Sequence, residues 1–393
     1  MERKLIQLSD VITDIAAGPF GSNLKVSCFV NDGFPIIDGA NLKSFKVTDN
    51  ITKFVTEEKA RSLHRSIAKR GDIVVTISGT LGQIAYIPDD SNYEEYLCSQ
   101  RQFRVTFDTT KVYVPYLVFY FHTYEGKHKI LSFANQVGVP ALSQPLKNFR
   151  QISVQLPTLE TQKKIASIVE SINGKIEQNE IINNNLEQQA QAIYQQMFID
   201  NARSDWAEGT LSDIADITMG QSPSGSSYNE DGTGTIFFQG RAEFGFRFPS
   251  VRLYTTEPKR MARSNDTLMS VRAPVGDLNV AHSDCCIGRG LAAIHSKSNH
   301  QSFVLYTMFS LKKQLDVFNG EGTVFGSINR NSLNDMPILI PSDDILDEFE
   351  RIVAPMDLTI RNNYDENCRL QDIRDTLLPR LMSGELDVSD IDI

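Results

Sequence analysis

Most of the sequence occurs in two related copies, and this internal repeat limits the possible folds more than any other feature. Three segments of the first half recur in the second half in the same order. The matching pairs are 8–11 with 211–214, 71–82 with 265–276, and 152–157 with 336–341. The spacing between copies falls from 203 to 184 residues along the chain, so the first copy carries insertions. We therefore expect two related domains that differ mainly in their surface loops.

Each copy is typical of a mostly β domain that ends in one long helix. Short runs rich in β-branched residues, such as Asp72–Ile77 and Leu268–Val271, lie between segments with Gly, Pro and Asn, which indicates strands joined by turns. Each copy then has an alternating run, Gln151–Leu156 or Pro337–Ile340, followed by a proline and a long helical segment. The predicted fold class is α+β: two similar, mostly β domains separated by two long antiparallel coiled-coil helices, with an internal pseudo-two-fold repeat.

The two predicted helices share one heptad pattern at a constant spacing of 184 residues. Apolar and Asn side chains recur at alternating intervals of three and four residues, which predicts a coiled-coil seam. The seam positions are Val169, Ile172, Ile176, Asn179, Asn183, Leu186, Ala190, Ile193 and Met197 in the first helix, and Val353, Met356, Ile360, Asn363, Asn367, Leu370, Arg374, Leu377 and Leu381 in the second. Both helices have Asn at the same two central positions, where a polar residue costs stability while fixing register and partner.

The connectivity of the chain sets the direction of this pairing. The first helix begins at the first domain and ends at the second, and the second helix leaves the second domain, so a pair of these helices is antiparallel. The alternative is two separate amphipathic helices, each packed on its own domain. The expected organisation is a first domain at 1–157, a first spacer helix at 158–204, a second domain at 205–341, and a second spacer helix with an acidic tail at 342–393. Two similar domains on a rigid spacer suit two half-sites on duplex DNA, about 34 Å apart.

The charge of the chain does not exclude DNA as a partner. The net charge is −10 at pH 7, but residues 342–393 alone contain 14 acidic and 5 basic side chains. Most of the acidic excess therefore belongs to the second helix and the tail. A whole-chain charge bears on solubility and long-range steering, and it leaves room for a basic face on either domain.

Other features of the composition favour a cytoplasmic, non-catalytic protein. Five cysteines without CxxC spacing suit neither a disulfide framework nor a zinc site, which favours a reducing cytoplasm. The longest apolar run, Tyr113–Phe121, is far shorter than the roughly 20 residues of a membrane helix. The sequence has no GxxxxGK loop, no Gly-rich dinucleotide or S-adenosylmethionine turn, no Asn/Asp-Pro-Pro-aromatic methyltransferase motif and no HExxH spacing. We expect no catalytic residues, no metal site and no bound cofactor.

Several short motifs lie in one or both copies. They are the Gly-containing turns Ala17–Ser22 and Gly220–Pro223, the segments Phe238–Gly240 and Gly326–Asn329, and the ends of the two units, Leu156–Gln162 and Leu377–Leu386. Together with the duplication, they resemble the specificity subunits of Type I restriction-modification systems, over essentially the full chain. The chain departs from that family at Pro341–Ile345, where the usual pattern is Pro-Pro-Leu-x-Glu-Gln. Whether a partner docks equally at the starts of both helices is therefore left open.

The resemblance implies two target-recognition domains, each of which reads one part of a split sequence of double-stranded DNA through the major groove. It implies that the helices serve as a spacer and as a dock for two methylation subunits, with motor-nuclease subunits as further partners. Adenine methylation with S-adenosylmethionine, and cleavage with ATP and magnesium, would belong to those partners. The implied role of this chain is DNA recognition without catalysis.

Candidate DNA contacts are residues with hydrogen-bonding side chains in loops, because such side chains read base edges and Gly allows close approach to phosphate. Most lie near a glycine, whereas Gln100, Arg101 and Arg104 flank a predicted strand. In the first domain they are Ser22, Asn23, Lys25, Asn41, Lys43, Ser78, Thr80, Gln100, Arg101 and Arg104. In the second domain they are Ser222, Ser224, Tyr228, Asn229, Gln239, Arg241, Arg272, Arg289 and Asn329. The alternative for each is ordinary solvated turn chemistry. Arg272 has the loop position of Ser78, which favours two different half-sites.

Three further features have more ordinary explanations. Tyr116–Phe121, Phe303–Phe309 and Trp206 could stack on bases, but their spacing favours core packing. The acidic tail, Asp387–Asp392, is typical of solvated charge. A rival function from another class is a coiled-coil scaffold that docks protein partners through two heads without reading DNA sequence.

Overall fold

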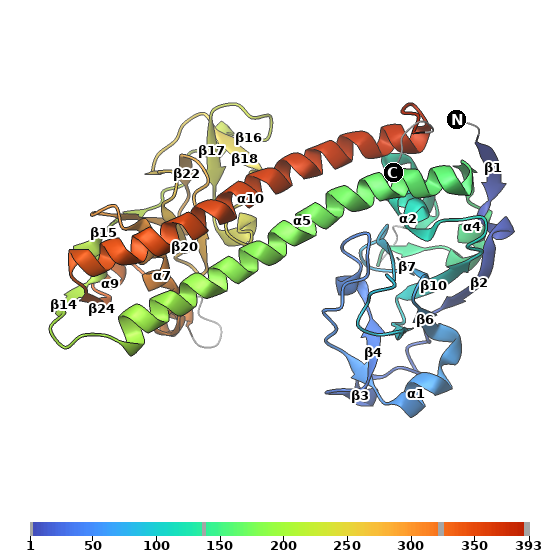
Figure 1. Ribbon diagram of the computed structural model, residues 1–393, viewed down its shortest axis with the longest axis horizontal. Helices are drawn as coiled ribbons and strands as arrows, with labels where there is room; N and C mark the ends of the chain where they lie inside the picture. Colours follow the sequence, from blue (N-terminus) through green and yellow to red (C-terminus); the bar gives the residue numbers. More distant parts are fainter. Residues whose placement is uncertain (1–2, 136–138, 321–325, 389–393) are drawn as a thin grey trace. The chain divides into compact units, whose positions relative to one another are not determined.

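The computed structural model describes residues 3–135, 139–320 and 326–388, which form two compact units (Figure 1). Unit 1 comprises Met1–Lys175 and Arg369–Ile393, and unit 2 comprises Ile176–Cys368. Each unit therefore contains one β domain and a part of each of two long helices. Most of the expected acidic tail lies outside the described residues.

Two sheets form the β domain of unit 1. Its strands are β1 (Lys4–Gln7), β2 (Ile12–Ala17), β3 (Phe29–Val30), β4 (Phe34–Ile37), β5 (Phe54–Val55), β6 (Ile67–Lys69), β7 (Ile73–Thr76), β8 (Ile84–Tyr86), β9 (Glu95–Cys98), β10 (Gln102–Phe107), β11 (Ala134–Asn135), β12 (Ala141–Leu142) and β13 (Ser153–Leu156). One sheet has the order β2-β10-β7-β8 and is antiparallel. The other has the order β3-β5-β4-β9-β6, in which β4 and β9 are parallel. Two strand pairs, β1-β13 and β11-β12, complete the domain.

The β domain of unit 2 repeats this topology. Its strands are β14 (Ala207–Thr210), β15 (Ala215–Met219), β16 (Tyr228–Asn229), β17 (Thr235–Phe238), β18 (Leu253–Thr255), β19 (Met261–Ala262), β20 (Thr267–Ser270), β21 (Leu278–Val280), β22 (Cys285–Ile287), β23 (Leu291–Ser296) and β24 (Pro337–Ile340). The sheet orders are β15-β23-β20-β21 and β16-β18-β17-β22-β19, again with one parallel pair, β17 and β22. The pair β14-β24 corresponds to β1-β13. The repeat in the sequence is thus a repeat in the order and direction of strands.

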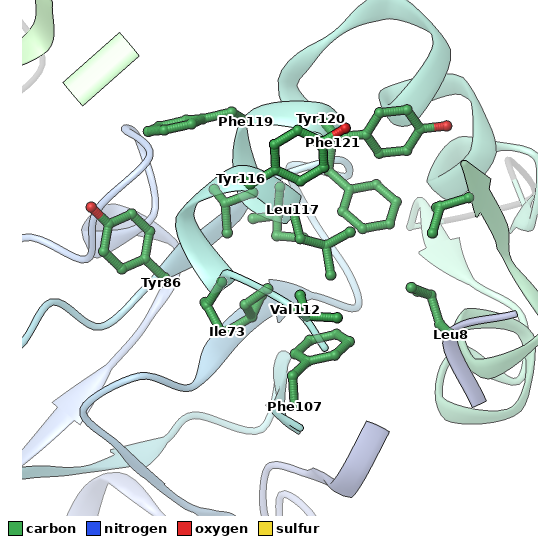
Figure 2. Close-up of a cluster of buried hydrophobic side chains, with 14 of the residues drawn as sticks. Leu8, Ile73, Tyr86, Phe107, Val112, Tyr116, Leu117, Phe119, Tyr120 and Phe121 are labelled. Carbon is green, nitrogen blue, oxygen red and sulfur yellow. The ribbon is translucent and has the colours of Figure 1, made fainter. Parts of the chain in front are cut away.

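Short helices pack against the sheets of each domain. They are α1 (Glu57–Ser62), α2 (Val114–His122), α3 (Tyr124–Leu131) and α4 (Pro145–Gln151) in unit 1, and α6 (Leu211–Ile214), α7 (Gln301–Ser310), α8 (Lys312–Leu315) and α9 (Arg330–Asn334) in unit 2. Figure 2 shows the aromatic side chains of α2, among them Tyr116 and Phe121, in one buried cluster with Leu8 and Phe107. The matching helix α7 is buried in the core of unit 2. These aromatic segments therefore pack in the cores, as expected.

Two long helices run through both units of the chain. The first, α5 (Leu159–Tyr194), continues into a π-helical turn at Gln195–Asp200, and the second is α10 (Asp343–Ser383). In unit 2 they pair antiparallel, because Asn179 Nδ2 donates to Asn367 Oδ1 at 2.8 Å while Asn363 Nδ2 donates to Asn183 Oδ1 at 2.8 Å.

The predicted seam positions face inward along both helices. All eighteen of the side chains given above for the seam are buried or half-buried. Apolar side chains elsewhere on the helices, such as Ile181, Leu358 and Ile373, are exposed. The predicted α+β fold class is confirmed: two mostly β domains share one topology, and the two long helices pair antiparallel. None of the helices in the described residues combines the length and apolar character that a membrane span needs.

Candidate nucleic-acid interface

Five of the candidate DNA-binding residues of the first domain line one groove in unit 1. They are Lys43, Ser78, Thr80, Gln100 and Arg101. The groove has a volume of about 580 Å³. Ser78 is half-buried and the other four side chains are exposed, so their hydrogen-bonding groups are accessible to a ligand.

The groove lies where strand ends of both sheets meet. Thr76 at the end of β7 pairs with Gln102 at the start of β10, and the next residue, Ile77, donates its N–H to the carbonyl of Arg101 at 2.7 Å. Ser78 follows this paired end and Gln100 precedes it, so both side chains leave the same edge of the sheet. The sequence predicted both residues, but only the pairing of β7 with β10 brings them together.

A glycine at the same position of both copies, Gly18 and Gly220, allows two backbone segments to approach closely beside this edge. A Cβ on Gly18 would lie 1.8 Å from the carbonyl oxygen of Ser99, and a Cβ on Gly220 in unit 2 would lie 2.2 Å from that of Gly288. No residue with a side chain fits at either position without moving the backbone. The Gly turns of the two copies therefore support the β9–β10 and β22–β23 turns, which carry Gln100, Arg101 and Arg289.

A hydrogen-bond network forms one wall of the groove in unit 1. The Gln83 amide donates to the carbonyl of Gly39 at 3.0 Å and accepts from the Thr76 hydroxyl at 3.1 Å. On the same wall, Lys53 Nζ lies 2.6 Å from Asp38 Oδ2. Burial would raise the pKa of Asp38, but its hydrogen bonds with Lys53 and with a backbone N–H outweigh burial and hold that pKa below its ordinary value.

The sequence did not single out Gln83, Lys53 or Asp38. Asp38 and Gln83 each adjoin a glycine, Gly39 and Gly82, so the signal that marked other candidates could have found them. Lys53 has no flanking glycine and reaches the groove through Asp38, 15 residues away.

Three more candidates of the first domain lie on the loop beside the groove. Ser22, Asn23 and Lys25 are exposed, and the alternating side chains Leu24 and Val26 line the groove. A Cβ on Gly21 would lie 2.7 Å from Gln100 Oε1, so this loop adjoins the β9–β10 turn. The loop therefore forms a wall with polar side chains directed to solvent.

Two candidates, Asn41 and Arg104, are buried, with their hydrogen-bonding groups engaged inside the domain. Asn41 is 4% exposed, and its amide group bonds to three backbone groups of its own loop at 3.1–3.2 Å. Arg104 lies within β10 with its side chain 10% exposed, and its guanidinium contacts Asp14 Oδ2 at 2.6 Å. Both residues stabilise the domain, because their donors are used inside it.

The matched edge of unit 2 carries Arg272 and Arg289. Ser270 of β20 pairs with Leu291 of β23, and Val271 donates its N–H to the carbonyl of Gly290 at 2.9 Å. Arg272 therefore has the position of Ser78, and Arg289 that of Gln100. Ser78 and Arg272 also form the same isolated β-bridge, each to the segment before a short helix. Both arginines are exposed.

Gln239 and Arg241 follow the end of β17 on the same side of the sheet. Gln239 is exposed, and the carbonyl of this residue accepts a hydrogen bond from Gly290 at 3.3 Å. Arg241 is exposed and forms an ion pair with Asp277, which occupies the position of Gln83 in unit 1. Lys312 also contacts Asp277, at 3.5 Å. This edge of unit 2 thus carries several basic side chains around one carboxylate.

The remaining candidates of the second domain form hydrogen bonds with groups of nearby loops. The Tyr228 hydroxyl and the Asn229 amide bond to nearby backbone groups at 2.9–3.1 Å. Asn329 Oδ1 accepts the N–H of the third residue after it at 2.9 Å and so caps α9. The hydroxyls of Ser222 and Ser224 also contact neighbouring loop groups. These five side chains shape the loops, and Ser224 and Asn329 are also exposed.

The described residues contain no group of three or more His, Cys, Asp or Glu side chains arranged to hold a metal ion. Apart from the paired carboxylates Asp38 and Asp277, the side-chain groups at these two edges are amides, hydroxyls, guanidiniums and ammoniums. These are the groups that bind base edges and phosphates in DNA.

Comparison with known families agrees with this chemistry. Residues 22–188 and 203–363 each match the Type I restriction modification DNA specificity domain. The chain belongs to this family. As a member of the specificity family it serves DNA target recognition in a restriction-modification system, a role that involves DNA and partner subunits.

Named relatives of this specificity protein come from archaea and bacteria. It is 27% identical over 376 residues to the putative type I restriction enzyme MjaX specificity subunit of Methanocaldococcus jannaschii, covering 91% of this chain and 88% of the relative. It is 22% identical over 404 residues to the type I restriction enzyme HindI specificity subunit of Haemophilus influenzae, covering 81% and 87%. Its fold is similar to that of the Type-I restriction-modification system S subunit from M. genitalium, with a TM-score of 0.61 at 14% identity, over 97% and 96% of the two chains.

Proposed function

We propose that this chain reads a bipartite target on double-stranded DNA, with each β domain reading one part of it. The observation that carries the proposal is the pair of matched edges. The same backbone hydrogen bonds support Ser78 and Gln100 in unit 1 and Arg272 and Arg289 in unit 2. A repeated scaffold with different hydrogen-bonding side chains at matched positions suits two half-sites of different sequence.

The chain acts in this proposal without catalysis of its own. It directs two methylation subunits to adenine at the target, and motor-nuclease subunits to DNA cleavage. S-adenosylmethionine, ATP and magnesium bind to those partners. DNA recognition, methylation and cleavage take place in the cytoplasm. The alternative, a scaffold that docks proteins without reading DNA, does not require different polar side chains at the matched edges.

An exchange of one domain tests the proposal. Residues 1–157 are replaced by the corresponding domain of another family member, and methylated adenines are mapped across the genome of cells that contain the methylation subunits. We expect one half of the methylated sequence to change and the other half to stay. The reciprocal exchange of residues 205–341 should change the other half. A change of both halves in either exchange contradicts separate reading by two domains.

A binding assay separates DNA reading from the scaffold alternative. The full chain with its methylation subunits is mixed with a random duplex library, and bound DNA is recovered by gel shift and sequenced. We expect a two-part motif. Recovery without any sequence preference would contradict the proposal and favour the scaffold.

A further inference from the structure

The matched edges of the two domains differ in one pair of side chains, and this difference bears on which bases are read. In unit 1 the pair is Ser78 and Gln100, and in unit 2 it is Arg272 and Arg289. Resting on the proposed function, we infer that Arg272 and Arg289 recognise guanine bases in the half-site read by the second domain.

The two arginines come from one edge of the sheet and have the same charge. They follow and precede the paired residues Ser270 and Leu291, so both guanidinium groups start from neighbouring strand ends. Like charges at neighbouring positions across two strands are destabilising in the absence of a ligand. An acceptor-rich partner over this edge would relieve the repulsion between them.

No carboxylate among the described residues forms an ion pair with either guanidinium. Both side chains are exposed, and neither forms an ion pair with a described residue, although the nearby Arg241 does. The carboxylate of that ion pair, Asp277, contacts Arg241 and Lys312. Arg272 and Arg289 thus keep all their side-chain donors for a ligand outside the chain.

Guanine is the base whose major-groove edge fits such donors. It presents two acceptors, O6 and N7, and a bidentate Arg contact to them is the commonest specific contact between protein and DNA. A phosphate also accepts from Arg, but phosphates are the same at every base pair and do not require different residues in two copies of one scaffold. The exchange of Ser for Arg and Gln for Arg at two matched positions therefore favours base reading.

The first domain is expected to differ at this position. The amide oxygen of a Gln side chain accepts from adenine N6 while its amide nitrogen donates to N7, so Gln100 suits adenine where Arg289 suits guanine. Arg101 also lines the groove of unit 1, and the matched residue in unit 2 is Gly290. The inference therefore concerns only Arg272 and Arg289, which match Ser78 and Gln100.

Two double variants of the full chain, assayed with the methylation subunits, test the inference. In R272S/R289Q the second domain carries the side chains of the first. In R272K/R289K the charge stays and the forked guanidinium is lost. Bound DNA from a randomised library is sequenced, and affinity is measured at several salt concentrations. Arg263→Gln is the matched control, because Arg263 is exposed before the start of β20, at the opposite end of that strand.

We expect guanine at one or two positions of the second domain's half-site, as assigned by the domain exchange. In both double variants the preference for guanine should fall by about 5- to 150-fold per contact, which corresponds to the cost of one bidentate pair. The other half-site should not change. R272K/R289K should keep the salt dependence of wild type, and Arg263→Gln should keep the whole motif.

Two results would overturn the inference while the proposed function stands. One is a two-part motif without guanine in this half-site. The other is a uniform loss of affinity in R272S/R289Q, with the motif unchanged and the salt slope reduced by about one for each arginine, which is the behaviour of phosphate contacts. Failure of the proposed function looks different, because wild type itself would then show no sequence preference.

Discussion

The two β domains share their backbone and differ in how they are fixed to the long helices. In unit 2 the contact is charged: Arg247 is 4% exposed and lies 2.9 Å from Glu187 of α5 and 2.9 Å from Asp357 of α10. In unit 1 the buried side-chain contact with α5 is neutral: Gln162, 1% exposed, accepts the N–H of Tyr113 at 2.8 Å. We call these buried contacts with the long helices anchors. The same topology therefore accommodates a charged anchor in one domain and a neutral anchor in the other, just as it carries different side chains at the two matched edges.

The difference matters because the two anchors fail in different ways. A buried ion pair that loses one partner leaves a charge in a poorly solvated place, whereas a buried amide that is lost leaves only unpaired dipoles. The second domain should therefore be more sensitive to the loss of its anchor than the first. Point substitutions can test this ranking directly.

Arg247→Ala should have the largest effect of those considered. It leaves Glu187 and Asp357 without their cation, and breaking a buried ion pair in this way costs about 3–5 kcal/mol. Unfolding in urea can be followed by the fluorescence of Trp206, the only tryptophan, which packs on the core of unit 2. Arg351→Ala, an exposed change on α10, is the control and should stay within about 0.5 kcal/mol of wild type. Equal losses in both variants would contradict a charged anchor.

Gln162→Leu should destabilise unit 1 by less. The side chain also donates to the carbonyls of Lys111 and Pro157 at 3.1 and 3.0 Å, so the change leaves buried groups unpaired at a cost of about 1–3 kcal/mol. Hydrogen exchange of the amides of α2 and of residues 159–175 measures the loss. Lys163→Leu, at an exposed neighbour, should leave that exchange unchanged. A loss above that of Arg247→Ala would reverse the proposed ranking of the anchors.

The helix seam offers a comparison within unit 2. Asn179→Leu removes the donor of the bond to Asn367, which is 8% exposed, and should cost about 1–3 kcal/mol. The double variant Asn179→Leu/Asn367→Leu replaces both amides by apolar groups and should recover part or all of this loss. Urea unfolding followed by Trp206 fluorescence measures both, with the exposed Asn184→Leu as control. A double variant less stable than the single one would show that the amide pair itself stabilises the seam.

The sequence was informative where a property depends on local order. Repeated segments gave the common topology, and intervals of three and four residues marked the seam. Glycines beside polar residues marked the loops at Ser78 and Arg289, and a neighbouring strand marked Gln100. Each of these signals lies within a few residues of the feature that it indicates.

Properties that depend on distant partners were not visible in this way. The sequence does not show that Arg104 is paired inside the domain, because its partner, Asp14, lies 90 residues away on another strand. Both anchors were missed for the same reason, since Arg247 and Asp357 are 110 residues apart. A side chain such as Arg104 or Arg272 has the same chemistry in the sequence, and only the packing of the sheet decides which of them is exposed.

The smallest expected effect concerns the pH dependence of the two units. Burial raises the pKa of Glu350, whose carboxylate accepts the N–H of Phe303 at 2.9 Å, whereas a hydrogen bond from Arg104 lowers that of Asp14 in unit 1. The folded state then binds the Glu350 proton more tightly than the unfolded state does. Its contribution to stability is therefore present below the ordinary pKa of 4.5 and falls as pH rises through the raised value. Asp14 has the opposite sign, with stability lost as pH falls below 3.8.

Glu350→Gln tests the sign in unit 2. Gln keeps an oxygen for the N–H of Phe303 but does not ionise, so the variant should lose less stability than wild type as pH rises above 4.5. Urea unfolding followed by Trp206 fluorescence at a series of pH values gives both slopes. Glu348→Gln, the same change at an exposed position of α10, should keep the slope of wild type. If Glu350→Gln also keeps the slope of wild type, the burial of Glu350 is not coupled to folding.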